Sequence, residues 1–149
     1  RRSSDLRFNQ FKHKGATVIA DYGHNPDAMR ALTKAIEAMK PKKSHVVVSG
    51  VGDRRDEDIR DLTRILGNSF DNVILYQDAC QRGREDGEVI KLLQEGLVGA
   101  TKVKNVKEIY GEFLAIDTAL NEISAGDICL ILIDQVEESL TYLKQQVKP

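Results

Sequence analysis

The chain has 149 residues, of which 41% are hydrophobic and 30% are charged, so its size and composition are those of one globular domain. Its 22 Lys and Arg against 23 Asp and Glu give a formal net charge of −1, which excludes a global basic field for nucleic acid or an anionic membrane. Trp is absent, aromatic residues make up 5%, and no apolar run approaches the ~20 residues of a transmembrane helix, so we expect neither base-stacking platforms nor a membrane span.

Short apolar segments alternate with helical patterns along the chain. Four segments rich in β-branched residues are continuous rather than alternating, which is typical of parallel strands buried on both faces. They cover residues 17–20, 46–49, 73–76 and 129–133. Residues 8–11 and 102–106 are weaker strand candidates, and His13 and His45, which border predicted strands, are expected at the surface.

Apolar residues recur at the three-and-four spacing of helices in five segments, each with one face directed at a core. The stripes run over residues 29–39, 59–66, 89–97, 113–123 and 136–147. Met39 and Phe113 belong to these stripes, so we expect both to be buried. Strand and helix alternate five times, which predicts an α/β fold: a Rossmann-like, doubly wound, mostly parallel sheet flanked by helices, formed by residues 1–149 as one domain.

Ligands of such sheets bind in the loops that follow the carboxyl ends of the strands. The candidate loops are residues 21–26, 50–56, 77–87 and 134–135. The first loop contains Asp21, His24 and Asn25 before Pro26, which suits the first turn of a helix. A carboxylate, an imidazole and an amide at a helix N-terminus suit a phosphate and its Mg²⁺. The alternative is that Asp21 and Asn25 only cap the helix while His24 packs.

The second loop carries two adjacent arginines, Arg54 and Arg55, on a segment with two glycines. The glycines begin a dinucleotide fingerprint, but Arg55 occupies the third glycine position, so the pattern is only a weak indication of NAD. Two arginines suit a carboxylate or a phosphate better, through bidentate hydrogen bonds. The alternative is a helix capped by Asp53 or Asp56 and followed by solvent-exposed charges.

The third loop places Arg82 and Arg84 on either side of a glycine, after Asp78, and is a second place where a carboxylate or phosphate could be held. The alternative is a mobile surface loop. Cys80 has no base near it in sequence, so we do not expect a nucleophile. Cys80 and Cys129 read as free thiols of a reducing compartment, which favours the cytoplasm. The sequence contains no P-loop motif and no Cys/His cluster for a structural metal.

The segment V-I-A-D-Y-G-H-N-P-D-A, residues 18–28, resembles the signature that opens the C-terminal domain of the Mur ligases. Within that family the chain is most similar to the cyanophycin synthetases. Further stretches carry the resemblance in the expected order, at residues 7–9, 52–58, 82–84 and 133–137. One departure is Leu6, where the family usually has Gly before the Arg-Phe pair.

The resemblance implies an ATP-dependent ligase in which a carboxylate is activated as an acyl phosphate and then attacked by the amine of an amino acid. A central domain supplies the P-loop and binds most of ATP and Mg²⁺, while the C-terminal domain helps to position ATP and the incoming amino acid. In a cyanophycin synthetase the substrates are L-arginine and the aspartate side chains of a poly-aspartate (cyanophycin) acceptor. The chain, which begins at Arg1, is then a fragment of a larger, homo-oligomeric, cytoplasmic ligase, and we expect the fragment alone to be inactive.

The resemblance also implies roles for individual residues. The predicted catalytic residues are His24 and Asp21. The residues expected near ATP are Arg7, Asn25, Arg54 and Arg55. The residues expected to bind the incoming amino acid are Asp78, at its guanidinium, and Arg82 or Arg84, at its α-carboxylate. No residue of this chain is predicted to be a metal ligand.

Two alternatives stay open. The first keeps the chemistry and changes the substrate: a Mur ligase of cell-wall synthesis, a folylpolyglutamate ligase, or a cyanophycin synthetase variant that uses a dipeptide. The second is a non-catalytic Rossmann-like binding domain. In that case Asp21, His24 and Arg55 could be replaced without loss of any activity of the parent protein.

Overall fold

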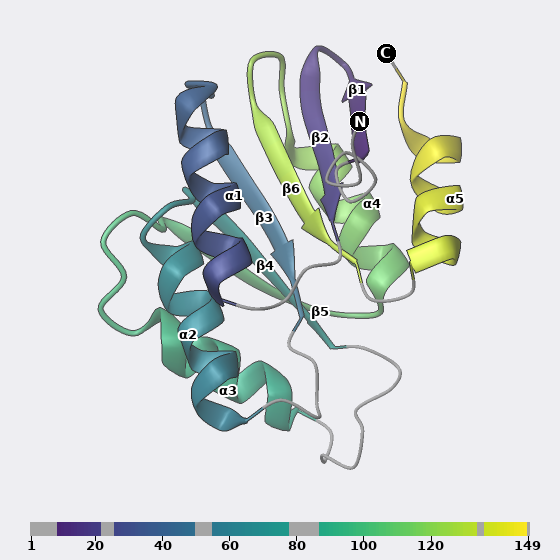
Figure 1. The fold of residues 1–149 in the computed structure, drawn as a ribbon. Coiled ribbons are helices and arrows are strands. Elements are labelled where there is room, and N and C mark those ends of the chain that lie inside the picture. Colours follow the sequence, from purple (N-terminus) through teal and green to yellow (C-terminus); the bar gives the residue numbers. More distant parts are fainter. Residues whose placement is uncertain (1–8, 22–25, 50–54, 78–86, 134–135, 149) are drawn as a thin grey trace.

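Strands and helices alternate along the chain in the computed structural model, which describes residues 9–21, 26–49, 55–77, 87–133 and 136–148 (Figure 1). The strands in these residues are β1 (Asn9–His13), β2 (Ala16–Asp21), β3 (Ser44–Val48), β4 (Asn72–Gln77), β5 (Asn105–Tyr110) and β6 (Ile128–Leu132). The helices are α1 (Pro26–Ala38), α2 (Asp56–Gly67), α3 (Glu88–Leu97), α4 (Glu112–Glu122) and α5 (Val136–Gln146).

The strands form one sheet in the order β1-β2-β6-β3-β4-β5. The pairs from β2 to β5 are parallel, and β1 is antiparallel to β2. Lys14 and Gly15 join β1 to β2 at φ values of 53° and 86°, and two central residues at positive φ make the turn whose twist matches a hairpin. The predicted Rossmann-like, doubly wound, mostly parallel α/β fold is confirmed.

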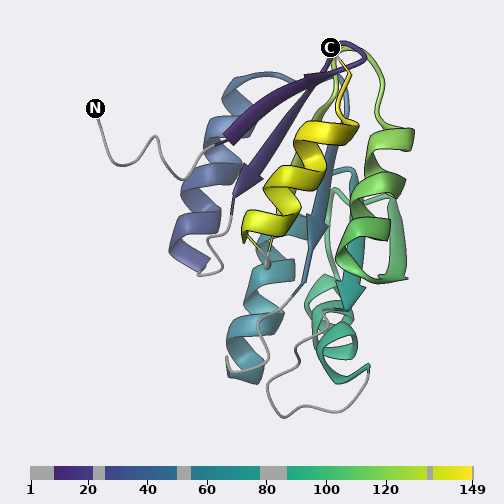
Figure 2. The ribbon, with the colours of Figure 1, turned by 90° about the vertical axis from the view of Figure 1, so that its right-hand side faces the viewer.

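The helices cover both faces of the sheet: α1, α2 and α3 pack on one face, and α4 and α5 on the other (Figures 1 and 2). From β2 through β3 and β4 to β5 the chain moves toward one edge of the sheet, and α1, α2 and α3 make these connections on one face. The chain then returns from β5 to the centre at β6, and α4 makes this connection on the opposite face. Each strand–helix–strand connection is right-handed, so the helix must change face when the order of strands along the sheet reverses.

The central strand β6 shows why the predicted strands are continuous apolar runs. Ile128, Leu130 and Leu132 belong to the core beneath α1–α3, whereas Cys129 and Ile131 belong to the core beneath α4 and α5. All five residues of β6 are therefore buried, as in parallel sheets covered on both faces. Burial raises the pKa of the Cys129 thiol well above its ordinary range, so this free cysteine is inert in the folded chain.

The close packing of α2 on α3 depends on Gly96. A Cβ atom there would lie 2.1 Å from the carbonyl oxygen of Arg60 and 2.1 Å from Oγ1 of Thr63, so no larger residue fits without moving a helix. The hydroxyl of Thr63 donates a hydrogen bond to the carbonyl oxygen of Leu93 at 2.6 Å. These contacts fix α2, whose first residue, Asp56, follows the second candidate loop.

Two strands differ from their predicted bounds. The edge strand β5 spans Asn105–Tyr110 rather than residues 102–106. Most of its side chains are exposed, because it has a neighbour on one side only and little helical cover, so its apolar signal is weak. The strand predicted at residues 8–11 is β1, Asn9–His13, and residue 8 lies outside the described residues.

Met39 and Phe113, predicted to be buried, are 44% and 39% exposed. Met39 lies beyond the end of α1 at Ala38, where the helical stripe no longer applies. Phe113 stacks on the ring of Tyr142, with centroids 4.5 Å apart, instead of entering the core between helix and sheet. The three-and-four pattern therefore identified the correct helices, but it ran one residue past the end of α1 and included Phe113, which lies in α4 outside the core.

Candidate functional site

The candidate site lies at the reversal point, which we define as the carboxyl ends of β2 and β6. These adjacent parallel strands lead into helices on opposite faces of the sheet, and such a divergence opens a crevice in which α/β proteins bind ligands. Asp21 is the last residue of β2, is paired in register with Leu132, and is 9% exposed. Its carbonyl oxygen accepts a hydrogen bond from the N–H of Ile133 at 2.9 Å. The structure thus places Asp21 at the reversal point.

Two further buried polar residues lie at the carboxyl ends of β3 and β4, and the sequence alone did not point to either. Ser49 directly follows β3 and is 2% exposed. Tyr76 of β4 is fully buried, and its hydroxyl donates a hydrogen bond to the carbonyl oxygen of Leu132 at 2.8 Å. Tyr76 sits within an apolar run that is typical of a core strand. Its link to β6 depends on strand order, which one sequence does not display.

Arg55 lies at the start of α2 with its side chain in solvent. Its backbone is extended (φ −68°, ψ 152°), and it occupies the N-cap position without a side-chain capping hydrogen bond. Nε and Nη2 donate to the two carboxylate oxygens of Asp58 at 3.2 Å each, and this pairing raises the pKa of the Arg55 guanidinium. Of the two caps in the alternative reading, Asp56 does not cap the helix, because it is already the first helical residue, and Asp53 lies outside the described residues.

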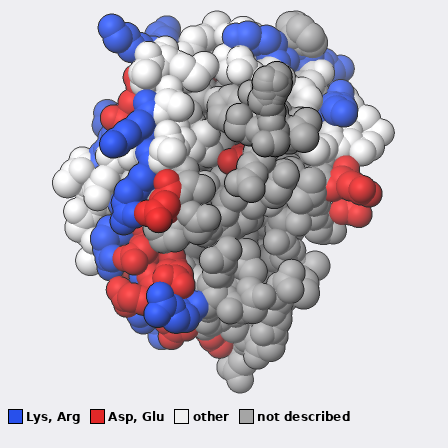
Figure 3. Space-filling model, in the orientation of Figure 1, with Lys and Arg blue, Asp and Glu red and all other residues white. Residues whose placement is uncertain are grey.

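The start of α2 is rich in charge (Figure 3, lower left). The first turn carries Asp56, Glu57 and Asp58, which are favourable at the positive end of a helix. Arg55 is bound to the last of these carboxylates in a forked, two-bond geometry. The same fork would fit a ligand carboxylate or phosphate, so an anion reaching this helix end can exchange with Asp58 for the guanidinium.

Gln77 holds together the two ends of the third candidate loop. Its side-chain Oε1 accepts a hydrogen bond from the N–H of Gly87 at 2.6 Å, across the loop of residues 78–86. Its carbonyl oxygen accepts another from the N–H of Gly111 at 3.4 Å, next to the start of α4. The loop therefore begins and ends at one place, directly beyond β4.

Most of the predicted site residues lie outside the described residues. They are Arg7, His24, Asn25, Arg54, Asp78, Arg82 and Arg84. Cys80 and the fourth candidate loop, residues 134–135, lie outside as well. The roles of these residues stay predictions. Within the described ranges, no group of three or more His, Cys, Asp or Glu side chains could hold a metal ion, and no helix is long and apolar enough to cross a membrane.

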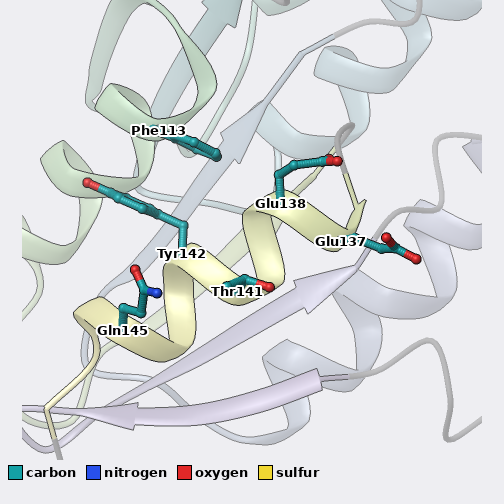
Figure 4. A pocket seen from close by; sticks show the side chains of 6 residues that line it. All are labelled: Phe113, Glu137, Glu138, Thr141, Tyr142 and Gln145. Carbon is teal, nitrogen blue, oxygen red and sulfur yellow. The ribbon is translucent and has the colours of Figure 1, made fainter.

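A surface hollow of about 470 Å³ lies between α4 and α5, to one side of the reversal point (Figure 4). The stacked rings of Phe113 and Tyr142 form one wall, and Glu138 lies beside them. The hydroxyl of Tyr142 donates to the carboxylate of Asp117 at 2.7 Å, which raises the pKa of Tyr142. Its lining residues belong to the first turn of α4 and to the first three turns of α5.

The opposite, amino end of the sheet holds a buried polar network. His45 and His13, predicted at the surface, are 5% and 4% exposed. Nε2 of His45 lies 3.0 Å from Oδ2 of Asp127, and Nδ1 lies 3.3 Å from Nδ2 of Asn72. Because an amide nitrogen donates, Nδ1 is the acceptor and Nε2–H donates to Asp127. Oδ2 of Asp127 also accepts from the N–H of Ser124 at 3.0 Å, so both ring nitrogens of His45 serve the fold.

Solved structures share this architecture. A UDP-N-acetylmuramoyl-L-alanyl-D-glutamate–2,6-diaminopimelate ligase superimposes with a TM-score of 0.76 at 20% identity, over 94% of this chain and 31% of that chain. E. coli FolC in complex with ADP superimposes with a TM-score of 0.72 at 23% identity, over 93% of this chain and 32% of that chain. At these identities the likeness shows the fold.

Sequence comparison carries the assignment further. The chain is 32% identical to a cyanophycin synthetase of Geminocystis herdmanii over 93% of its length, and spans 16% of that protein. It is 41% identical to a UDP-N-acetylmuramoyl-L-alanyl-D-glutamate–2,6-diaminopimelate ligase of Zymomonas mobilis over 78% of its length, and spans 23% of that protein. The predicted resemblance is confirmed. The profile of the family "Mur ligase, glutamate ligase domain" matches residues 6–132, and the chain belongs to that family.

Proposed function

We propose that this chain is the C-terminal domain of an ATP-dependent amide-bond-forming ligase, and that the parent is a cyanophycin synthetase adding L-arginine to aspartate side chains. The observation that carries the proposal is the position of the family signature. Residues 18–28 begin on the strand that ends at the reversal point, where Asp21 lies, and the family matches over residues 6–132. The chain spans 16% of its cyanophycin synthetase relative, and in this proposal other domains of the parent supply most of the ATP site.

The residues present fit an ATP-side role. Asp21 brings a carboxylate to the reversal point, where we assign it a catalytic role beside the phosphates, while Mg²⁺ held mainly by the central domain would supply charge neutralisation. In sequence His24 and Asn25 come directly before α1, and we assign them and Arg7 to the same end of the sheet. Arg55 offers an exposed, forked guanidinium at the start of α2. In this proposal the residues bind and orient the phosphates while the amine approaches.

The incoming amino acid is assigned to the loop after β4. Gln77 at the end of β4 is bonded to Gly87, so the two described residues that flank residues 78–86 lie together. We assign Asp78 to the guanidinium of L-arginine and Arg82 or Arg84 to its α-carboxylate. An acid for the side chain and a guanidinium for the carboxylate match the charges of free arginine.

A second candidate is a ligase of the same chemistry with another amino acid. The 41% identity to a diaminopimelate ligase over 78% of the chain favours it specifically. In that reaction class Asp21 and Arg55 would have the same proposed roles at the phosphates. It differs in the loop of residues 78–86, where the incoming amino acid would be recognised.

The test uses the complete parent protein with Mg-ATP and a cyanophycin-like primer. Phosphate release is recorded with L-arginine, L-aspartate, both, an aspartyl-arginine dipeptide and diaminopimelate. We expect release that depends on arginine. Release with the dipeptide alone changes the substrate, release with diaminopimelate alone selects the second candidate, and no release from a folded parent contradicts the ligase proposal.

Arg55→Ala then tests the placement of the site. We expect turnover to fall about a hundredfold, as for the loss of charge-assisted hydrogen bonds to a reacting phosphate or carboxylate. Arg64→Ala is the matched control, because Arg64 is an exposed arginine of the same helix that pairs with Asp61 three residues before it. Equal effects of the two variants would remove the assigned role of Arg55.

A further inference from the structure

Tyr76 links two strands that are not neighbours in the sheet. It lies on β4, yet its hydroxyl donates to the carbonyl oxygen of Leu132 on β6 at 2.8 Å, and its side chain is fully buried. Strand β3 lies between the two, and its register with β6 ends at the pair Val47–Ile131. The phenol therefore reaches past the end of the β3–β6 ladder and holds β6 one residue further on.

The end of β6 is held from its other side by β2. The N–H of Ile133 donates to the carbonyl oxygen of Asp21 at 2.9 Å. Leu132 and Ile133 are thus fixed between β4 and β2 directly before the chain passes to α5. In α5 the fully buried Ser139 donates from its hydroxyl to the carboxylate of Glu112, which ties the first turns of α5 to the start of α4.

The residue after Tyr76 is Gln77, which closes the ends of the third loop through Gly87. Residues 76 and 77 therefore connect two parts of the proposed site. Tyr76 reaches the reversal point, where Asp21 lies, and Gln77 anchors the loop assigned to the incoming amino acid. A buried hydrogen bond in a low-dielectric core holds such a connection in one geometry.

We infer that Tyr76 is a positioning residue, whose hydroxyl fixes the end of β6 relative to β4 and so sets the position of Gln77, at the end of β4, relative to Asp21. The inference rests on the proposed function for the reaction it affects, but the geometry it concerns is independent of the substrate. The fully buried side chain of Tyr76 is assigned no contact with either substrate. It acts because small misplacements of two reacting groups slow their reaction far more than they weaken the binding of either one.

The experiment is Tyr76→Phe in the parent protein, which removes the hydroxyl and keeps the buried ring. We expect kcat with the preferred amino acid to fall about tenfold, with the KM values for ATP and for the amino acid changed less than about threefold. Because a smaller folded fraction would also lower kcat at unchanged KM, kcat is expressed per folded enzyme, with the folded fraction measured by circular dichroism. Tyr142→Phe is the matched control, because it removes a hydroxyl bound to Asp117 between α4 and α5 and should leave kcat unchanged.

Hydrogen exchange in the same variants supplies a readout without turnover. We expect amides in the peptide that covers β6 and Ile133 to exchange about tenfold faster in Tyr76→Phe, and not in Tyr142→Phe. Unchanged exchange at β6 would overturn the inference, and so would faster exchange with unchanged kcat, because the bond would then be structural alone. Absence of turnover in the unmodified parent refutes the proposed function instead. The exchange comparison then decides by itself whether Tyr76 holds β6.

Discussion

The two ends of the sheet both carry buried polar side chains, but these side chains are used differently. At the amino end, His45 and Asp127 bond to each other, and Asn72 and Ser124 complete the network. At the carboxyl end, Asp21 is placed by strand pairing, and the chain that follows carries the family signature. Burial of a polar residue therefore does not mark a site by itself. Its position relative to strand direction does, because ligands of parallel sheets meet the carboxyl ends.

The contrast predicts that the amino end affects stability and not turnover. Asp127→Ala removes the acceptor of two donors, His45 Nε2–H and Ser124 N–H, in a buried place. We expect the free energy of unfolding to fall by about 2–4 kcal/mol, as for two buried donors left unsatisfied. Urea denaturation measures this loss. Turnover of the parent well below its unfolding temperature should be unchanged, and a large loss of kcat at preserved folding would break the contrast.

Cys129 reports whether the amino end opens locally. It is paired in register with His45, is fully buried, and has a raised thiol pKa because of burial. In a Cys80→Ser background we expect a thiol reagent to modify Cys129 only when the chain unfolds. The modification rate should rise in Asp127→Ala by the same factor as the unfolded population, which the lost stability sets. If Cys129 in the unmutated chain is modified much faster than global unfolding allows, this end of the sheet opens locally.

The smallest effect expected at the amino end is a pH dependence from His13. Burial and the nearby Lys14 lower the pKa of His13 below its ordinary value of 6.5, and its Nδ1 accepts from the N–H of Lys148 at 2.9 Å. The unfolded chain then binds more protons just below pH 6.5. Stability should therefore be complete above that pH and decline as the pH falls toward the folded-state pKa.

His13→Gln is the variant that isolates this dependence. We expect it to reduce the slope of stability against pH below 6.5, because the proton uptake of His13 on unfolding is then absent. Unfolding curves at a series of pH values measure the slope. An identical slope in the variant would assign the acid sensitivity to other groups.

The sequence was sufficient for the fold because its strongest signals are local. Continuous apolar runs such as residues 129–133 mark strands covered on both faces, and helical stripes separate them, so topology followed from general crossover rules. The edge strand β5 was misplaced because its side chains are largely exposed. The predicted burial of Phe113 was wrong because its ring, in the first turn of α4, stacks on Tyr142 instead of packing in the core.

The candidate site was predictable only in part. Asp21 follows the strand predicted at residues 17–20, so its place at the carboxyl edge of the sheet could be inferred before the strand order was known. Tyr76 and His45 could not be found in this way, because their partners Leu132 and Asp127 are distant in sequence and become neighbours only through the insertion of β6 between β2 and β3. Long-range pairs of this kind leave no periodic signal in a single chain.

A comparison of two histidines tests the central contrast most directly. In the parent protein, His24→Ala alters the family signature after β2, and His45→Ala removes the buried partner of Asp127 at the opposite end. We predict that His24→Ala abolishes amino-acid-dependent phosphate release while its unfolding temperature is unchanged, and that His45→Ala lowers the unfolding temperature while release at low temperature persists. Full activity in His24→Ala, or loss of activity in a folded His45→Ala protein, would contradict the account.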